Sequence, residues 1–321
     1  MKKALENNVL TIVLDERFDS VNGRQTEAEM NEHILLSIIT PVHEPDPESF
    51  QRTVRSVMNV MQKNWEWVVI LHNTDSLTPD DVLALAGESE SVRVFLKHDD
   101  VHAPWSPRNY ALTKARGKYV YFVDHDDELK EEFLLPALEK MERENCDILI
   151  GRADKVLADP DLFEVPTLLD FPDSAEGIIV PDDPDVRGRL LYGAAIMLSC
   201  KVIRRDLIVE NGIAFDPDIL LTEDVLFALR CYTKARKICL MPRLTAYTYV
   251  QNEGSLLQRM LKEDSFPTEV YTEPVRIIVN LALENRISPS GYLWMMMGMF
   301  TMIYQKSSMS PSSSRTALSA T

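Results

Sequence analysis

The chain has 321 residues, 45% of them hydrophobic, and a formal net charge of −16 at pH 7. This length allows one large core or two modest ones. The negative charge argues against a nucleic-acid backbone or an anionic membrane as the main partner, so a small anionic ligand would need a local positive site or a metal ion.

An alternation of strands and helices follows an N-terminal extension over residues 1–33. Residues 34–40 form a continuous apolar run that ends at Pro41, which is typical of a strand buried on both faces. A helix is predicted next, because Asp46 can cap it and Pro47 suits the first helical position. Apolar residues then recur at helical spacing, namely Phe50, Val54, Val57, Met58 and Met61.

The same unit of strand and helix recurs along the chain. Further strands are predicted over 67–71, 92–96, 119–123 and 147–150. Helices are predicted to open at Thr78-Pro79 and Ser106-Pro107, and to end near Ala86, Ala115 and Glu144. This alternation predicts an α/β fold, with a mostly parallel sheet flanked by helices on both faces.

Two carboxylates, Asp124 and Asp126, come directly after the strand predicted over 119–123. Open α/β sheets bind ligands at this end of their strands, and an Asp-x-Asp there can hold a divalent cation against a diphosphate. The alternative is a solvated acidic turn or helix start. The other Asp-x-Asp sequences, at 159–161, 183–185 and 216–218, have proline at their centre and follow no predicted strand, which is typical of turns.

The pattern changes beyond about residue 155, where repeated prolines mark a long irregular stretch that we expect to be functional or mobile. Later elements are predicted as a helix near Asp185, a strand over 195–203, a helix capped by Thr222, and strands over 237–241 and 245–250. The Met-rich run over 292–304 is predicted to be a core helix or a homodimer contact, since it lacks the basic face of an interfacial helix. We expect the Ser-rich tail over 307–321 to be disordered.

The four cysteines, at positions 146, 200, 231 and 239, show no Cys-x-x-Cys spacing. They therefore indicate neither a zinc ribbon nor a disulfide framework. We expect a reducing, cytoplasmic setting, with the chain peripheral at the inner face of the membrane as an alternative. We also expect no signal peptide, and the run over 292–304 is too short to span a bilayer alone.

Several motifs together resemble the inverting family 2 glycosyltransferases with the GT-A (Rossmann-like) fold. Residues 37–44, Ser-Ile-Ile-Thr-Pro-Val-His-Glu, resemble the opening strand of that family, and residues 108–127 are similar to its central block. Three later motifs of the family are matched in the expected order. The segments that resemble them are residues 222–227, 237–242 and 247–249. The match covers about 34–255. It implies a nucleotide-binding half over 34–153, an acceptor half over 154–255, and a smaller, mainly helical C-terminal region over 256–306.

The resemblance implies a metal-dependent, inverting transfer of sugar from a nucleotide diphosphate sugar, a UDP-sugar above all, to an acceptor hydroxyl. By this resemblance Asp126 binds the metal, and Asp124 is shared between the ribose and the metal. Hard oxygen ligands suit Mn²⁺ or Mg²⁺, and diphosphate oxygens and water would complete the coordination. The ion would neutralise the charge that grows on the leaving diphosphate.

Three further residues receive roles from the same resemblance. Asp224 is the candidate general base, kept ionised by the helix dipole, and Glu223 beside it is expected to bind the acceptor. Arg108 is expected to contact the donor nucleotide or its phosphates near the start of its helix. Without the resemblance, Thr222-Glu-Asp is an ordinary helix start and Arg108 is a surface residue paired with an acid.

The nucleotide-binding loops depart from the family pattern. Where Asp-Asp-Gly-Ser is usual after the second strand, this chain has Leu71-His-Asn-Thr-Asp-Ser76, so that Asn73 and Asp75 are both candidates for binding the base. The donor is also expected to meet Pro41, His43 and Glu44, where His43 is either stacked on the base or a solvent-facing turn residue. No late histidine is available to the metal. We therefore expect weak metal binding without nucleotide.

Three other functions fit parts of the pattern. A sugar nucleotidyltransferase would require a glycine-rich basic loop after the first strand, whereas residues 41–46 are acidic and contain no glycine. In a phosphatase with an Asp-x-Asp nucleophile, a small hydroxyl residue is usual at the position of Glu128. A non-catalytic nucleotide-binding or carbohydrate-binding module would not need both Asp126 and Asp224. We therefore expect a glycosyltransferase of polysaccharide or glycoconjugate synthesis, with a saccharide, lipid-linked or protein acceptor.

Overall fold

The computed structural model describes residues 34–157, 176, 177, 179, 180, 198–219, 223–251, 276, 279 and 280. Several predictions concern segments outside these residues. They are the extension over 1–33, the helix near Asp185, most of the irregular stretch after residue 157, the run over 292–304 and the tail over 307–321.

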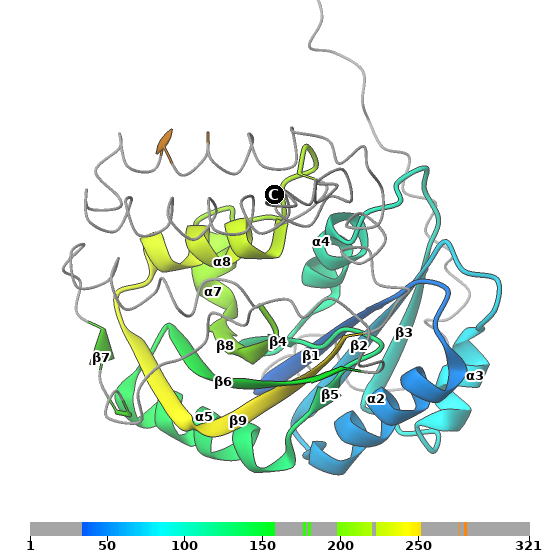
Figure 1. Ribbon diagram of the computed structural model, residues 1–321, viewed down its shortest axis with the longest axis horizontal. Helices are drawn as coiled ribbons and strands as arrows, with labels where there is room; N and C mark the ends of the chain where they lie inside the picture. Colours follow the sequence, from blue (N-terminus) through cyan, green and yellow to red (C-terminus); the bar gives the residue numbers. More distant parts are fainter. Residues whose placement is uncertain are drawn as a thin grey trace, which may run out of the picture. The chain divides into compact units, whose positions relative to one another are not determined.

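The described residues build one sheet of nine strands (Figure 1). The strands are β1 Leu36–Val42, β2 Trp65–His72, β3 Val92–Lys97, β4 Tyr119–Phe122, β5 Glu128–Leu129, β6 Ile148–Leu157, β7 Ile179–Val180, β8 Lys201–Arg204 and β9 Ile238–Gln251. Their order is β3-β2-β1-β4-β8-β6-β9-β5, and β7 pairs with β9. The first four strands are parallel, as predicted, whereas β8 runs antiparallel to both β4 and β6. The sheet is therefore mixed in its second half.

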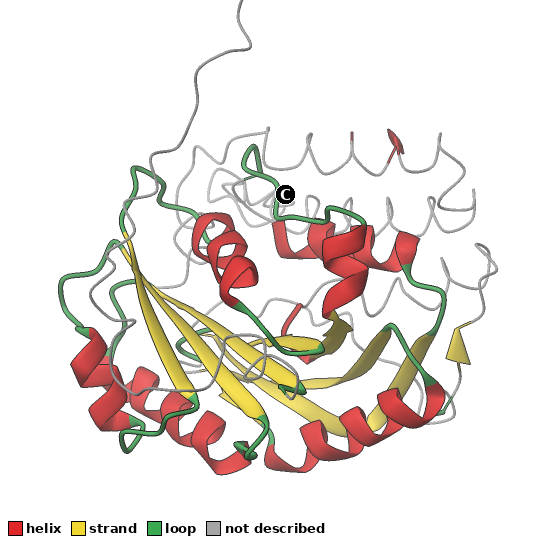
Figure 2. Ribbon diagram, turned by 180° about the vertical axis from the view of Figure 1, so that it is seen from behind, coloured by secondary structure: helices red, strands yellow, loops and turns green. Residues whose placement is uncertain are grey.

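Helices cover both faces of the sheet, as the alternation predicts (Figures 1 and 2). One face carries α2 Pro47–Val60, α3 Pro79–Leu85 and α5 Glu131–Glu144, and the other carries α4 Trp105–Lys114, α7 Arg205–Glu210 and α8 Glu223–Lys234. The predicted cap of α2 is confirmed, because the carboxylate of Asp46 accepts a hydrogen bond from the amide of Ser49 at 2.9 Å. Helix α4 begins at Trp105, slightly earlier than the predicted opening at Ser106-Pro107.

The prediction that Pro41 ends the first strand is wrong, because β1 continues through Val42. The carbonyl of Ile39 accepts a hydrogen bond from the amide of Val123, so the backbone groups of Ile39 point toward β4. Pro41 lies two residues later, and its backbone therefore faces the same side. Pairing between β1 and β4 stops at Ile39 and Phe122. The missing N–H of Pro41 therefore falls beyond the end of that ladder, which is where a strand tolerates proline.

The second half of the sheet differs from the prediction in two strands. The two short strands expected over 237–241 and 245–250 are one strand, β9, with a break in its pairing to β6 between Met241 and Thr245. The proline that lies between the two predicted strands falls within this break. Of the strand expected over 195–203, the described part is a short 3-10 helix at Leu198–Cys200 followed by β8 at Lys201–Arg204.

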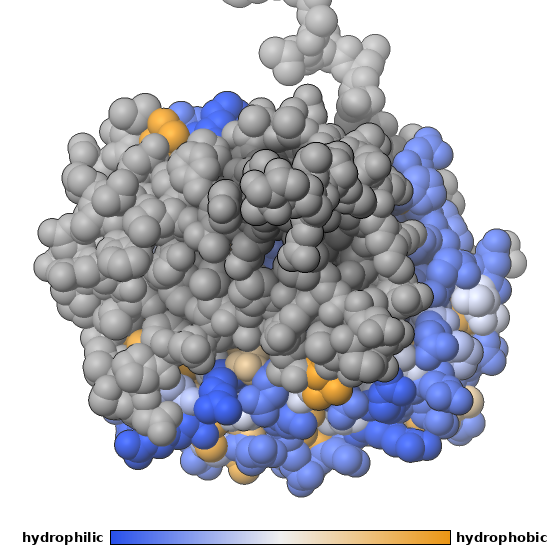
Figure 3. All heavy atoms as spheres, in the orientation of Figure 1, coloured by the Kyte–Doolittle hydropathy of each residue, from blue (hydrophilic) through white to orange (hydrophobic). Residues whose placement is uncertain are grey.

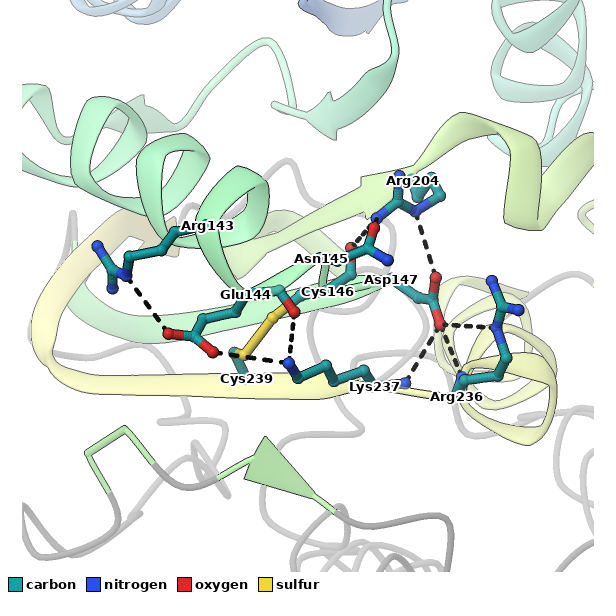
Figure 4. Close-up of a disulfide and its surroundings, with 9 residues drawn as sticks. All are labelled: Arg143, Glu144, Asn145, Cys146, Asp147, Arg204, Arg236, Lys237 and Cys239. Carbon is teal, nitrogen blue, oxygen red and sulfur yellow. Dashed lines mark hydrogen bonds and ion pairs between the residues drawn. A yellow bond between two sulfur atoms is a disulfide. The ribbon is translucent and has the colours of Figure 1, made fainter.

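Two of the four cysteines form a disulfide, contrary to the expectation (Figure 4). Cys146, just before β6, is bonded to Cys239 in β9, because β6 and β9 are parallel neighbours and both cysteines lie near the start of their strands. Spacing along the sequence does not reveal a pair that sheet pairing brings together across 93 positions. The cytoplasmic setting was inferred from the absence of a disulfide, and it loses that support.

The surface of the described residues is mostly hydrophilic on the face shown in Figure 3. Large hydrophobic residues that are exposed come from separate elements, namely Leu85, Leu96, Leu135, Val156 and Val209. In the part of the chain that the structure describes, no helix is both long enough and apolar enough to cross a bilayer.

Candidate active site

The acidic turn after β4 is held in place from two sides. The backbone amide of Asp127 donates to the carbonyl of Asp124 at 3.2 Å and closes the turn. From α2, the hydroxyl of Thr53 donates to the carbonyls of His125 at 2.9 Å and Asp127 at 2.7 Å. From β9, the hydroxyl of Tyr247 accepts from the amide of Asp124 at 3.1 Å. The carboxylates of Asp124 and Asp126 are thus carried by a rigid loop at the end of a buried strand.

Asp127 anchors this turn, a role that the sequence analysis did not assign. The residue is 1% exposed, and its carboxyl accepts from the hydroxyl of Tyr247 at 2.5 Å and from the amide of Val250 at 2.6 Å. Burial raises the pKa of Asp127 well above its ordinary value, and the charges of Asp126 and Asp124 raise it further. The sequence signal that could have revealed this anchor was Tyr247, because it lies in one of the motifs that resemble the family. No hydrogen-bond partner was predicted for it.

Arg108 joins the acidic turn to the start of α8. Its guanidinium donates to Asp124 at 2.8 Å and to Glu223 at 2.5 Å. Only 7% of the residue is exposed, and its guanidinium carbon lies over the Phe215 ring, 5.6 Å from the ring centroid. Despite burial, the neighbouring carboxylates Asp124, Glu223 and Asp224 hold the pKa of Arg108 above its ordinary value. The contact of Arg108 with a donor nucleotide stays a prediction. The buried Nε of Arg108 has no hydrogen-bond partner among the described residues.

The loop that carries Phe215 packs against Arg108 and is hydrogen-bonded to α4. The side chain of Asn109, next to Arg108 on α4, donates to the carbonyl of Phe215 and accepts from its amide, both at 2.9 Å. The Phe215 ring stacks on Phe227 of α8 at 4.1 Å between ring centroids. Helices α4 and α8 are therefore fixed to each other at the position where the acidic residues meet.

Glu223 and Asp224 open α8 and face the same cluster of charges. Burial raises the pKa of both carboxyl groups, while the positive charge of Arg108 opposes the rise. Asp124 contributes to the raised pKa of each, which places the two halves of the predicted site within electrostatic reach of each other. A carboxylate with a raised pKa is a stronger base than an exposed aspartate, as proton abstraction requires.

The residues predicted to bind the base of a nucleotide lie at the ends of β1 and β2. Pro41 is buried, whereas His43, Glu44 and Asp75 are exposed. The Nδ1 atom of His43 lies 2.9 Å from the carbonyl oxygen of His72. Glu44 adopts a left-handed conformation with φ of 41°.

Asn73 has a second role that the sequence did not reveal. Its amide nitrogen donates to the carbonyls of Asp99 at 2.8 Å and Val101 at 2.9 Å, and its oxygen accepts from the amide of Asp99 at 3.0 Å. Asp99 in turn accepts from Ser106 at 2.6 Å and lies 2.8 Å from His72. Although burial opposes the effect, these contacts hold the pKa of Asp99 well below its ordinary value. Asn73 thus fixes the loop after β3, which leaves Asp75 as the more accessible of the two candidates.

The side chains at the acidic turn suit a hard divalent cation. Asp124 and Asp126 supply carboxylate oxygens, which Mg²⁺ and Mn²⁺ prefer, and the Asp124 side chain is 33% exposed. No group of three or more His, Cys, Asp or Glu side chains is arranged as a complete metal site within the described ranges. An ion bound here would therefore need ligands from a phosphate group and water.

Comparisons with known proteins identify the family of this chain. The model of the family described as glycosyl transferase family 2 matches residues 37–208. The poly(ribitol-phosphate) beta-N-acetylglucosaminyltransferase TarS of Staphylococcus aureus is 27% identical over 151 residues, or 47% of this chain. The poly(ribitol-phosphate) beta-glucosyltransferase of Bacillus spizizenii is 25% identical over 223 residues, or 68% of this chain. These matches span 24% and 33% of the two relatives' own lengths.

A solved structure shows the same fold. The crystal structure of Staphylococcus aureus TarS 1–349 in complex with UDP-GlcNAc aligns with a TM-score of 0.59 at 20% identity. The alignment covers 77% of this chain and 66% of that chain.

Proposed function

The chain belongs to glycosyltransferase family 2, and we propose that it transfers a sugar from a nucleotide diphosphate sugar to an acceptor hydroxyl with inversion at the anomeric carbon. One observation carries this proposal. Arg108 bridges Asp124 after β4 and Glu223 at the start of α8, which brings the candidate diphosphate site next to the candidate base Asp224.

The donor side of the site is the acidic turn. Asp126 and Asp124 would hold Mn²⁺ or Mg²⁺ through carboxylate oxygens, and the bound ion would neutralise the charge of the departing nucleoside diphosphate. Asp127 and Tyr247 hold the turn that carries both carboxylates. Rigid placement of this kind lowers the barrier, because little reorganisation is needed when charge develops.

The acceptor side is the start of α8. Asp224 takes the proton of the acceptor hydroxyl while the oxygen forms a bond to the anomeric carbon, and the electrons of the breaking glycosidic bond leave with the diphosphate. Attack from the face opposite the leaving group inverts the configuration. Glu223, which already accepts from Arg108, orients the site and contacts the acceptor.

The relatives suggest the substrate class. TarS has been crystallised with UDP-GlcNAc and with UDP, and the named relatives act on poly(ribitol-phosphate). We therefore propose a UDP-sugar donor and a saccharide or polyol-phosphate acceptor in the synthesis of a cell-surface polymer.

A thermal-shift screen tests the donor and the metal together. The protein is heated with UDP-, dTDP- and GDP-sugars, each with Mn²⁺ or with EDTA. We expect a UDP-sugar with Mn²⁺ to raise the melting temperature, because a ligand that binds only the folded state stabilises it. Equal melting temperatures with all nucleotides, or an equal shift in EDTA, would contradict the proposal.

A further inference from the structure

Tyr247 is a fully buried tyrosine of β9 whose hydroxyl reaches the acidic turn. The backbone amide of Asp124 donates to this hydroxyl at 3.1 Å, and the hydroxyl donates to the carboxylate of Asp127 at 2.5 Å. Because an amide N–H can only donate, the single hydrogen of the hydroxyl is left for Asp127. The three groups therefore form a chain of hydrogen bonds that runs in one direction, from Asp124 through Tyr247 to Asp127.

The strand that carries Tyr247 also holds the far end of this chain. The backbone amide of Val250 donates to the other carboxylate oxygen of Asp127 at 2.6 Å. The carbonyl of Ala246 accepts from the amide of Lys130 at 3.1 Å, where β5 pairs with β9. Asp127 cannot shift relative to β9 without breaking these hydrogen bonds, so it is a fixed anchor for the hydroxyl of Tyr247.

Asp124 is held at its backbone and at its side chain by different elements. Its amide donates to Tyr247 on β9, and its Oδ1 atom accepts from Arg108 on α4 at 2.8 Å. The side chain is nevertheless 33% exposed, so that Oδ2 is the oxygen that can turn to a cation. Hydrogen-bonded partners behind a metal ligand fix its orientation, and the amide bond to Tyr247 is such a contact.

We propose that Tyr247 is a positioning residue for the metal site, and that its hydroxyl fixes the backbone of Asp124 so that the carboxylate meets the divalent cation bound with the donor diphosphate. This inference rests on the proposed function, in which Asp124 and Asp126 hold that cation. Because Tyr247 is buried behind the turn, its effect is confined to the part of donor binding that depends on the metal.

The test removes only the hydroxyl, by Tyr247→Phe. In this variant the amide of Asp124 and the carboxylate of Asp127 both lose a buried partner. The turn then shifts to regain hydrogen bonds, and the carboxylate of Asp124 moves with it.

Tyr121→Phe is the matched control. Tyr121 is also a fully buried tyrosine, on β4, and its hydroxyl donates to the carbonyl of Ala246 at 3.1 Å. That carbonyl keeps its hydrogen bond from Lys130 when the hydroxyl is removed. The control therefore loses the same atom from the same sheet without releasing the backbone of Asp124.

Calorimetry measures the Kd of UDP in Mn²⁺ and in EDTA, well below the melting temperature of each variant, and the ratio of the two values is the metal enhancement. We expect Tyr247→Phe to reduce the metal enhancement by roughly 10-fold or more, as is typical when a partner behind a metal ligand is lost, and to leave the Kd in EDTA within about twofold of the wild type. Tyr121→Phe should keep both values within about twofold.

A second variant guards against a loss of stability in the first. Tyr247→Phe/Asp127→Asn removes the buried charge that the single variant leaves without the hydroxyl, while the side-chain oxygen of the new residue can still accept from Val250. We expect it to melt no lower than Tyr247→Phe. It should lose as much of the metal enhancement, because the amide of Asp124 still lacks its partner.

The possible failures are distinguishable. A wild-type metal enhancement in either variant would overturn the inference and leave the proposed function intact. An equal loss of affinity in Mn²⁺ and in EDTA, or unfolding of both variants, would assign Tyr247 to the fold alone and would also overturn it. Equal affinity of the wild type for UDP in Mn²⁺ and in EDTA would instead refute the proposed metal site, and with it the premise of the inference.

Discussion

The guanidinium of Arg108 donates to the carboxylate of Glu223 at 2.5 Å, although 115 positions separate the two residues along the chain. The contact ties α4 to α8. Because Arg108 also donates to Asp124, it serves as a shared counter-charge for groups that would otherwise repel one another.

Removing this counter-charge should be strongly destabilising. We expect Arg108→Met to lower the free energy of unfolding by about 3 kcal/mol, since it leaves buried carboxylates without a partner. The double variant with Glu223→Gln should lose less than the sum of the two single changes in a denaturant titration. Arg52→Met is the matched control, because its ion pair with Glu128 is partly exposed and should change stability by less than about 1 kcal/mol. Full additivity would show that Arg108 and Glu223 are not coupled.

Turnover should depend on pH through Asp224. Burial raises its pKa above the ordinary value, so the protonated form persists to higher pH and kcat should fall as the pH drops below this raised pKa. The raised pKa of Asp224 in the folded state also favours folding while this carboxyl is protonated. Its contribution to the free energy of unfolding is therefore lost as the pH rises through the folded pKa. We therefore expect kcat and stability to change in opposite directions. A kcat that is constant between about pH 4 and 8 would contradict this assignment.

Much of the fold was predictable because it follows local patterns. Short stretches of sequence are enough to reveal the continuous apolar runs of β1 and β2 and the helix caps Asp46 and Thr78. The antiparallel pairing of β8 between β4 and β6 was not predictable, because it depends on contacts between segments far apart in the sequence. The disulfide between Cys146 and Cys239 escaped for the same reason.

The candidate site was assigned where its residues match family motifs, and the roles given to those residues stay predictions. Asp124, Asp126 and Asp224 were assigned in this way, and the structure brings both halves of the site together through Arg108. The match to glycosyltransferase family 2 sets aside the nucleotidyltransferase and phosphatase alternatives.

Gly117 is a position where the packing allows only glycine. A Cβ atom there would lie 2.4 Å from the amide nitrogen of Ser37 and 2.8 Å from its Oγ, which also accepts from the amide of Gly117. We expect Gly117→Ala to lower the free energy of unfolding by about 3 kcal/mol, because backbone must move. Gly212→Ala is the control, since it meets open space at φ of +59° and should lose only about 1 kcal/mol. Equal losses in thermal unfolding would contradict the proposed clash.

The disulfide should contribute measurably to stability. It links Cys146 and Cys239 across 93 positions, and a loop of this length corresponds to at most about 4 to 5 kcal/mol of unfolded-state entropy. We expect dithiothreitol to lower the melting temperature of the wild type and to leave the double variant Cys146→Ala/Cys239→Ala unchanged. Thiol titration of the oxidised, denatured protein should detect only Cys200 and Cys231. Four reactive thiols would show that the bond is absent.

Donor binding and turnover, compared in two single variants, test the central claim most directly. Calorimetry with UDP-GlcNAc and Mn²⁺ gives the affinity, and UDP release gives kcat. We predict that Asp224→Asn binds the donor within about twofold of the wild type and turns over at least about 100-fold more slowly, whereas Asp126→Asn loses Mn²⁺-dependent binding. Wild-type turnover in Asp224→Asn, or unchanged Mn²⁺-dependent binding in Asp126→Asn, would contradict the account.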